Sequence, residues 1–435
     1  MILRDPVHGL VTFESPEAEI VEKLLATKEV QRLRRIRQLG LTSLAFPGAE
    51  HTRFSHAIGA AFVMQSLIDR LRRLDGALPF WQRLTSDRAR DAMAAALLHD
   101  LGHGPFSHLF EQVIPDGPPH EDWTIRIILD ETSEVHRVLA EHDPGMPRRV
   151  ADLVVGKHEL PYLANAVSGT FDVDRCDYLL RDAWATGVTY GDYDLPWLLR
   201  SLRLDLPTSE LDAPGLAVDG MKGITAIESF LLARLFMFQQ VYFHKTTRAA
   251  EIMIRSILGR ALTLLADGAR LPSPATKNEA NIAALGVFAV GAEPSTPEYL
   301  ALDDQTILSA ITAWQESADP TLADLSKRLS TRTLFKTIEL GNVESSASPE
   351  EALALGRAAA EARGLDPTAY VALDHAEDTP FPDDARVRVI FPDGRSRDLA
   401  EVSFLLGRLR GQAVSRTRLV FAAELRDELR GALCR

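Results

Sequence analysis

Histidine and aspartate side chains gather in three short segments within the first 180 residues. His99 and Asp100 are adjacent at the end of an apolar run, and His103 follows four residues after His99. On a persisting helix, residues four apart share one face. Neutral imidazoles and carboxylates together bind divalent transition metals that keep open positions for water and substrate. With His56 upstream and Asp174 downstream, the set His56, His99, Asp100 and Asp174 predicts a metal site.

Each of these four residues has an ordinary alternative on its own, because a lone buried histidine usually only packs in a core. The set as a whole favours a metal. Imidazole and carboxylate ligands accept iron, manganese, magnesium, zinc, nickel or cobalt, so the identity of the divalent metal stays open. A bound metal of this kind lowers the pKa of its water, which serves hydrolysis.

The composition is that of an ordinary globular protein. The 435 residues are 46% apolar and 25% charged, and the net charge is −13. This balance argues against coating nucleic acid as the main role, although local arginines still permit a phosphate substrate. The two cysteines, Cys176 and Cys434, give no disulfide framework. The start of the chain lacks a signal-peptide pattern and no run approaches about 18 apolar residues, so we expect a cytoplasmic protein without a membrane span.

Helical patterns fill most of residues 1–265, and the character changes after them. The expected helices span 29–39, 56–74, 87–101, 107–114, 121–129, 174–185, 223–265 (one or two helices), 306–329 and 399–409. The expected strands span 387–391 and 418–422, with a loop at 377–384. The sequence therefore predicts a mainly α fold: a helical core (1–265), a helical extension with a linker (266–340) and a small α+β C-terminal appendage (341–435).

Six motifs follow one another along the chain. They are Gln38-Leu39-Gly40, Phe46-Pro47-Gly48-Ala49, His51-Thr52-Arg53-Phe54-Ser55-His56, His99-Asp100-Leu101-Gly102-His103-Gly104-Pro105-Phe106-Ser107-His108, His120-Glu121 and Asp172-Val173-Asp174-Arg175-Cys176-Asp177-Tyr178. Together they resemble the HD superfamily of metal phosphohydrolases, and within it the deoxynucleoside triphosphate triphosphohydrolases. The resemblance runs from Asp5 to about Lys336. It implies an HD-type helical core, expected here without the SAM-like N-terminal extension of animal members.

Carried over position by position, the resemblance gives the same four metal ligands. It also implies a catalytic role for His103, His108, Glu111 and His120. On a helix His108 and Glu111 are neighbours, and a carboxylate beside an imidazole favours the protonated ring. His108 is thus a candidate acid for the leaving oxygen, with His120 as its rival. Animal members have aspartate where this chain has Glu111, and the alternative is that one of these histidines only caps a loop.

Basic side chains at Arg53, Arg175 and Arg234 match family positions that hold a triphosphate, and Lys245 is a further candidate. At position 175 arginine replaces a family lysine, which keeps the charge but changes the hydrogen-bond geometry. Most surface arginines bind nothing. The placement of two of these beside predicted metal ligands favours a phosphate role.

The resemblance implies sugar recognition by Gln38, Leu39, Tyr178, Asp182 and Tyr242. Tyr178 and Asp182 follow the last metal ligand at spacings of four, so all three share one helix face. In the family, a tyrosine at position 242 crowds the 2′ carbon and excludes ribose, and residues at positions 38, 39 and 182 contact the 3′-hydroxyl. The alternative is that both tyrosines are ordinary core aromatics.

We therefore predict a metal-dependent deoxynucleoside triphosphate triphosphohydrolase, which acts on a dNTP and releases deoxynucleoside and tripolyphosphate. One alternative is another phosphohydrolase on the same site, either a nucleotidase or a phosphodiesterase acting on single-stranded nucleic acid. The three basic positions favour a polyphosphate instead. A nucleotide-sensing regulatory module would keep the pocket but lose the metal ligands, and none of the four is altered.

The resemblance also implies a homo-oligomer, a dimer or a tetramer, with nucleotide bound between subunits. Gln31, Arg34, Arg332 and Lys336 match contacts of such a regulatory site. Ala26 stands where a family aspartate reads guanine, and alanine accepts no hydrogen bond from a base edge. We therefore expect activation by dNTPs with little preference for GTP. The alternative is that these basic residues form intersubunit salt bridges and bind nothing.

Overall fold

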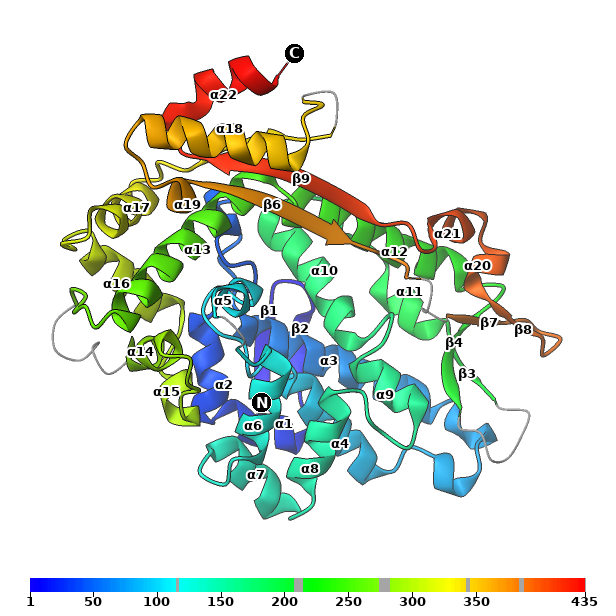
Figure 1. Cartoon of the computed structure of the whole chain (residues 1–435). Coiled ribbons are helices and arrows are strands. Elements are labelled where there is room, and N and C mark those ends of the chain that lie inside the picture. Colours follow the sequence, from blue (N-terminus) through cyan, green and yellow to red (C-terminus); the bar gives the residue numbers. More distant parts are fainter. Residues whose placement is uncertain (115–116, 207–213, 274–281, 342–344, 383–386, 435) are drawn as a thin grey trace.

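The chain folds mainly into helices, with small sheets among them (Figure 1). A computed structural model describes residues 1–114, 117–206, 214–273, 282–341, 345–382 and 387–434. The first part contains β1 (Ile2–Asp5), β2 (Gly9–Thr12), α1 (Glu19–Leu25), α2 (Lys28–Arg32), α3 (Arg53–Arg72), α4 (Ser86–Leu98), α5 (His108–Val113), α6 (His120–Leu129), α7 (Glu134–His142), α8 (Met146–Val154), α9 (Pro161–Val167) and α10 (Val173–Thr186). The predicted mainly α class is confirmed.

The rest of the chain mixes helices with short strands. Its elements are α11 (Leu195–Arg200), β3 (Leu202–Asp205), β4 (Gly215–Asp219), α12 (Ile224–Met237), a π-helical turn (Phe238–Tyr242), α13 (Lys245–Ala266), α14 (Ala283–Ala289), α15 (Thr296–Leu300), α16 (Asp304–Trp314), α17 (Pro320–Ser330), β5 (Lys336–Glu339), α18 (Pro349–Ala362), α19 (Pro367–Tyr370), β6 (Val371–Asp378), β7 (Arg388–Ile390), β8 (Ser396–Asp398), α20 (Leu399–Val402), α21 (Phe404–Leu409), β9 (Val414–Phe421) and α22 (Arg426–Leu433).

Three helices position the predicted metal ligands: His56 lies in α3 and Asp174 in α10, and the pair His99-Asp100 directly follows α4. Thr85 caps α4 by accepting from the backbone N–H of Arg88, and Asp172 caps α10 by accepting from that of Arg175. Helices α3 and α10 approach closely at Gly59, because a Cβ there would lie only 1.8 Å from Asp177 Oδ1. The absence of a side chain at this glycine thus lets a carboxylate of α10 reach the metal-ligand face of α3.

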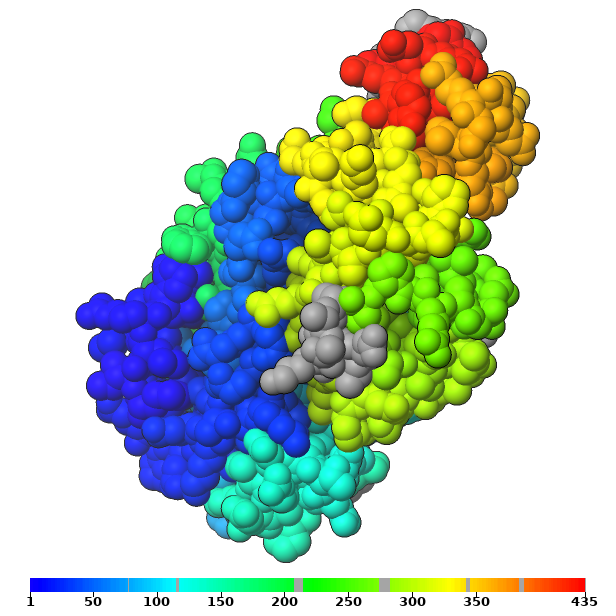
Figure 2. Space-filling view, turned by 90° about the vertical axis from the view of Figure 1, so that its left-hand side faces the viewer, coloured from blue at the N-terminus to red at the C-terminus, as the bar shows by residue number. Residues whose placement is uncertain are grey.

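The C-terminal chain joins both hydrophobic cores. In one sheet, of order β3-β4-β7-β8, β7 pairs in parallel with β4 and so adds tail residues to the first core. In the other, of order β5-β9-β6, β9 pairs antiparallel with both neighbours beside α18 and α22. On the face that Figure 2 shows, orange and red atoms of the C-terminal chain gather at one end of the molecule, beyond the yellow segment. The predicted domain limits at 265 and 340 stay predictions.

Several stretches differ from the sequence-based expectation, and the helix expected over 399–409 is two helices, α20 and α21, that meet at Ser403. The helix expected over 29–39 ends in a short 3-10 turn at Leu33–Arg35. The next residues are extended because they pair with the segment before α3: Arg53 N–H donates to Ile36 C=O (2.9 Å) and Gln38 N–H to His51 C=O (3.0 Å). The loop expected over 377–384 begins two residues inside strand β6, which the sequence pattern did not reveal, and positions 383–384 lie outside the described residues.

One stretch, Ile224–Tyr242, is long and apolar enough to cross a membrane by length and composition alone, whereas the sequence analysis found no such run. Half of it is buried inside this fold, and Ile227, Phe230 and Met237 pack in the first core. Its apolar character is therefore accounted for by packing. Its final π-helical turn widens the helix and carries Phe238 and Tyr242 to the wall of a cleft.

Candidate metal and substrate site

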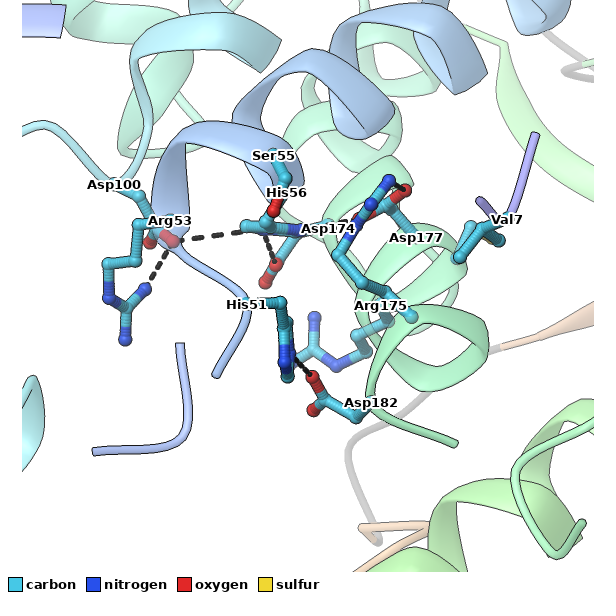
Figure 3. Close-up of polar contacts among 12 residues, drawn as sticks. Val7, His51, Arg53, Ser55, His56, Asp100, Asp174, Arg175, Asp177 and Asp182 are labelled. Carbon is cyan, nitrogen blue, oxygen red and sulfur yellow. Dashed lines mark hydrogen bonds and ion pairs between the residues drawn. The ribbon is translucent and has the colours of Figure 1, made fainter. Parts of the chain in front are cut away.

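Three predicted ligands, His56, His99 and Asp174, lie together where α3, α4 and α10 meet, and Figure 3 shows His56 and Asp174 facing each other. His56 Nε2 lies 3.0 Å from Asp174 Oδ1 and 3.2 Å from His99 Nε2, and His99 Nε2 lies 3.4 Å from the same carboxylate oxygen. Three donor atoms this close are those that would hold one divalent cation. Residues from three separate motifs are thus brought into one cluster.

Asp100 lies beside this cluster but faces other partners. Its Oδ2 atom pairs with Arg53 and lies 3.7 Å from His56 Nε2. Its Oδ1 atom lies 3.2 Å from His103 Nε2 and 3.5 Å from His99 Nε2. In this structure Asp100 is therefore held by Arg53 and His103, next to the three residues that would hold a metal.

A carboxylate that the sequence analysis missed orients the first ligand. Asp177 Oδ2 lies 2.7 Å from His56 Nδ1, and both oxygens of Asp177 accept from Arg181 at 2.8 Å. His8 Nε2 lies 2.6 Å from Asp177 Oδ1. A carboxylate on the far nitrogen fixes the ring and leaves Nε2 for a metal. The sequence signal was available, since Asp177 and Arg181 are four apart on the helix that carries Asp174.

The donor set fits a divalent cation. Burial alone would lower the pKa of His56, but hydrogen bonds to Asp174 and Asp177 outweigh burial and raise that pKa to about 10. Burial opposes ionisation of Asp174, yet His56 and His99 hold its pKa below the usual range. A carboxylate held between two imidazoles favours a positive charge beside it, which a protonated ring or a metal can supply. The surroundings that hold a proton on His56 would equally favour a metal in its place.

The second predicted group surrounds one glutamate. Glu111 Oε1 lies 3.0 Å from His120 Nδ1, 3.4 Å from His108 Nδ1 and 3.9 Å from His103 Nδ1. The rings of His103 and His120 stack at 3.7 Å. The loop between α4 and α5 is strained, with φ of 57° at Phe106 and 61° at Ser107. A positive φ raises the free energy of any residue that carries a side chain. That loop brings His103 and His108 to the same carboxylate.

Both groups open into a cleft of about 690 Å³. The three predicted phosphate ligands line it, and each is already paired with a carboxylate: Arg53 with Asp100, Arg175 with Asp172 and Arg234 with Asp378. A larger hollow of about 1080 Å³ is lined by none of the predicted site residues. The cleft is therefore the hollow in which metal ligands and anion-binding groups coincide.

The predicted sugar contacts lie on one wall of the cleft. Tyr242 donates its hydroxyl proton to Asp182 Oδ2 (2.8 Å), and His51 Nε2 lies 2.7 Å from Asp182 Oδ1. The ring of Tyr178 lies 6.5 Å from those of His56 and Tyr242. Gln38 and Leu39 also line the cleft, and Gln38 Oε1 is buried without a partner among the described residues.

Some lining residues come from elements that carried no sequence signal for a site. His375, Ala376 and Glu377 of β6 lie on the rim, as do Arg248 and Glu251 of α13. Their place depends on the packing of β6 against α13, which no local motif encodes. The C-terminal chain therefore contributes directly to the cleft.

The four predicted regulatory residues form two separate pairs within one chain. Arg34 donates to Gln31 Oε1 (2.7 Å) and stacks on Phe54 at 3.6 Å. Arg332, with φ of 57°, donates to Leu44 C=O (2.8 Å). A hollow of about 430 Å³ holds six basic side chains and lacks Gln31 and Arg34. These six are Lys245, Arg332, Lys336, Arg418, Arg426 and Arg430.

Two protein-family models match this chain, and one of them covers most of the motifs that carry the candidate metal ligands. Residues 53–182 match the family described as HD domain, and residues 208–271 match the HD associated region. The chain is 34% identical over 433 residues to the uncharacterized protein YwfO of Bacillus subtilis, covering 98% of this chain and 92% of that protein.

Two further similarities concern phosphohydrolases. The deoxynucleoside triphosphate triphosphohydrolase SAMHD1 homolog of Dictyostelium discoideum is 30% identical over 292 residues, which is 63% of this chain and 52% of that relative. This chain thus spans about half the length of that protein. The crystal structure of a phosphohydrolase from Bacteroides thetaiotaomicron is 29% identical with a TM-score of 0.79, covering 97% of this chain and 99% of that one.

Proposed function

Because the chain belongs to the HD superfamily of phosphohydrolases, we propose that it hydrolyses deoxynucleoside triphosphates to deoxynucleoside and tripolyphosphate with a divalent metal. The observation that carries the proposal is the cluster of His56, His99 and Asp174 in a cleft that three arginines line. When bound, the metal supplies Lewis acidity and a water of lowered pKa. Similarity to a protein named as a deoxynucleoside triphosphate triphosphohydrolase supports the choice of substrate.

The three arginines hold the phosphate chain in this proposal. Each guanidinium is preorganised by a carboxylate, so it points into the cleft at little further entropic cost. A triphosphate carries more negative charge than one carboxylate and offers more acceptor oxygens. It can therefore share or replace these partners when it binds.

Proton transfer to the leaving oxygen falls to the group around Glu111. Burial opposes ionisation of this carboxyl, but His108 and His120 outweigh burial and hold its pKa below the usual range. An ionised carboxylate stabilises a protonated ring beside it. His120 is the more enclosed of the two, whereas His108 is 66% exposed at the mouth. Both histidines are candidates for the general acid, and both contact the same carboxylate, that of Glu111.

Sugar selection falls to Tyr242, which Asp182 holds by its hydroxyl. A ring fixed at this wall would crowd the 2′ carbon of a bound sugar and so disfavour a 2′-hydroxyl. The same carboxylate is available to a 3′-hydroxyl. We also propose that the protein is a homo-oligomer and that the basic hollow around Arg332 and Lys336 binds nucleotide phosphates.

The test is product analysis with each dNTP across a panel of divalent metals. We expect tripolyphosphate and deoxynucleoside, and loss of turnover in Asp174→Asn with an unchanged helical spectrum. Asp152→Asn, which alters a surface carboxylate, is the matched control. Stepwise release of orthophosphate, or cleavage of nucleoside monophosphates or single-stranded nucleic acid in place of dNTPs, would contradict the proposal.

A further inference from the structure

The group around Glu111 has the composition and spacing of a transition-metal site in its own right. One ligand atom from each of the four residues His103, His108, Glu111 and His120 lies within 4.8 Å of the others, and the Nδ1 atoms of the three histidines face Glu111 Oε1. Three imidazoles and one carboxylate are a ligand set that zinc accepts. We propose that these four residues bind a second divalent transition metal, with zinc preferred, separate from the ion at His56, His99 and Asp174.

Distances within the group match a tetrahedral ion. Bonds of zinc to nitrogen and oxygen of about 2.0 to 2.2 Å place neighbouring ligand atoms about 3.3 to 3.6 Å apart. The three nitrogens lie 3.0, 3.4 and 3.9 Å from Glu111 Oε1. These values bracket the tetrahedral edge. Because the rings of His103 and His120 are stacked at an interplanar angle of 15°, one of the two rings must turn for both to bind the same ion.

An unpartnered nitrogen points to a ligand. His103 is 1% exposed, and its Nδ1 atom is buried without a hydrogen-bond partner among the described residues. Its Nε2 atom is occupied, because Asp100 Oδ1 lies 3.2 Å away. A carboxylate on the far nitrogen is the arrangement that fixes a ligating histidine and leaves its other nitrogen free for a metal.

The surrounding charges permit a second cation. Arg53 is a cation whose charge disfavours a positive charge on His103, but it is itself paired with Asp100. Glu111 supplies the negative charge at the centre of the group. His108 is 66% exposed on the first turn of α5, so an ion has an entry path and the last ligand can close over it. Because a metal on Nδ1 prevents proton exchange with Glu111, occupancy by excess zinc is expected to slow the proposed hydrolysis.

The experiment counts bound ions and needs no turnover. The full-length protein is stripped with a chelator and dialysed against Zn²⁺, and bound zinc is measured by atomic emission. A parallel titration with Co²⁺ follows the intense visible absorption of tetrahedral cobalt. We expect two ions per chain in the wild type, and one in Asp174→Asn, in which the tetrahedral absorption persists.

The double variant His108→Ala/His120→Ala is expected to bind one ion and to lose the tetrahedral absorption. Glu111→Gln preserves the side-chain volume and is expected to weaken the second ion at least tenfold. His142→Ala, which removes a surface histidine, is the matched control and should keep both ions. A wild type that binds one ion, or a second ion retained by the double variant and by Glu111→Gln, would overturn the proposal. A protein that fails to hydrolyse dNTPs but still binds two ions would contradict the proposed function and leave the second metal site supported.

Discussion

Arg234 of α12 donates from Nη2 to Asp378 Oδ1 across 3.0 Å, and so joins the helical core to the last residue of strand β6. A second bond runs from its Nη1 atom to Pro380 C=O (3.2 Å). Both side chains are largely buried, and Asp378 Oδ2 and Arg234 Nε lack partners among the described residues. A carboxylate from the C-terminal chain thus forms an ion pair with an arginine of the candidate phosphate site, where a substrate phosphate would otherwise bind.

Removing the charge of Asp378 should therefore favour substrate. Asp378→Asn is expected to lower KM for a dNTP with little change in kcat, because Arg234 no longer has to leave a carboxylate. If the exchange contributes about 1 kcal/mol, the net scale of one hydrogen bond, KM falls roughly fivefold. Steady-state kinetics test this, with Asp393→Asn on an exposed turn as the control. An increase in KM would instead mean that Asp378 positions Arg234 for substrate.

The bond between Asp177 and His56 should govern metal affinity. Asp177→Asn keeps the shape but removes the charge that orients the ligand, and such changes typically cost about 10- to 100-fold in metal affinity or activity. The measurement is competition with a chromophoric chelator. Asp152→Asn should behave as the wild type. If Asp177→Asn binds metal with wild-type affinity, this carboxylate does not contribute to metal binding.

Gly59 should tolerate no side chain. A Cβ at this position would lie 1.8 Å from Asp177 Oδ1 and 2.3 Å from Arg181 Nη2, so the ion pair behind His56 must move. Gly59→Ala is expected to lower the melting temperature and to weaken metal binding together. Gly259→Ala, where a Cβ meets nothing within 4 Å, is the control and should change neither. Normal metal affinity in Gly59→Ala would show that the helices can separate without loss of the site.

Stability should fall as the pH rises through neutrality because of Glu251. Burial raises the pKa of this carboxyl from 4.5 to about 7, against the lowering effect of Arg248. The folded protein then keeps a proton that the unfolded chain releases, so the contribution to stability is complete below about pH 4.5 and is lost as the pH passes about 7. The side chain is 24% exposed, which moderates the effect to about 1 to 3 kcal/mol.

Glu251→Gln stays neutral at every pH and should remove this dependence. Thermal melts from pH 4 to pH 9 test it, with Glu361→Gln on the surface of α18 as the control. We expect the variant to match the wild type in acid and to exceed it above pH 7. If the melting temperatures of the wild type and Glu251→Gln change with pH in parallel, a group other than Glu251 causes the pH dependence.

Tyr242 should set the preference for deoxyribose. Tyr242→Ala opens the wall beside Tyr178 and is expected to narrow the ratio of kcat/KM for dGTP over GTP by about 10- to 100-fold, the scale of a steric pocket. Tyr242→Phe loses only the bond to Asp182 and should keep most of the discrimination. Equal use of GTP and dGTP by the wild type would show that the pocket selects on another basis.

The basic hollow offers a regulatory test. Hydrolysis of one dNTP, measured with and without each other nucleotide and alongside sedimentation, should show stimulation by dNTPs with little preference for GTP. The double variant Arg332→Ala/Lys336→Ala should lose this stimulation and keep its basal rate. Strict dependence on GTP, or a monomer under all conditions, would contradict the proposed regulation.

The sequence by itself determined the residue types of the site and their order. His99 and Asp100 end a helix, and Asp174 begins another, because caps and helical periodicity are local properties that a short stretch encodes. The spacing of Tyr178 and Asp182 after Asp174 was likewise enough to place them on one wall. Such features depend on neighbours within a few residues.

Only the tertiary structure decided which charges meet. The contact of Asp177 with His8, the pairing of β7 with β4 and the approach of Asp378 to Arg234 join residues separated by more than 140 positions. Each is fixed by close packing: a glycine that admits a carboxylate between two helices, and strands whose backbone groups must find partners once buried. Side chains that are silent in the local pattern therefore acquire their partners only when the whole chain is folded.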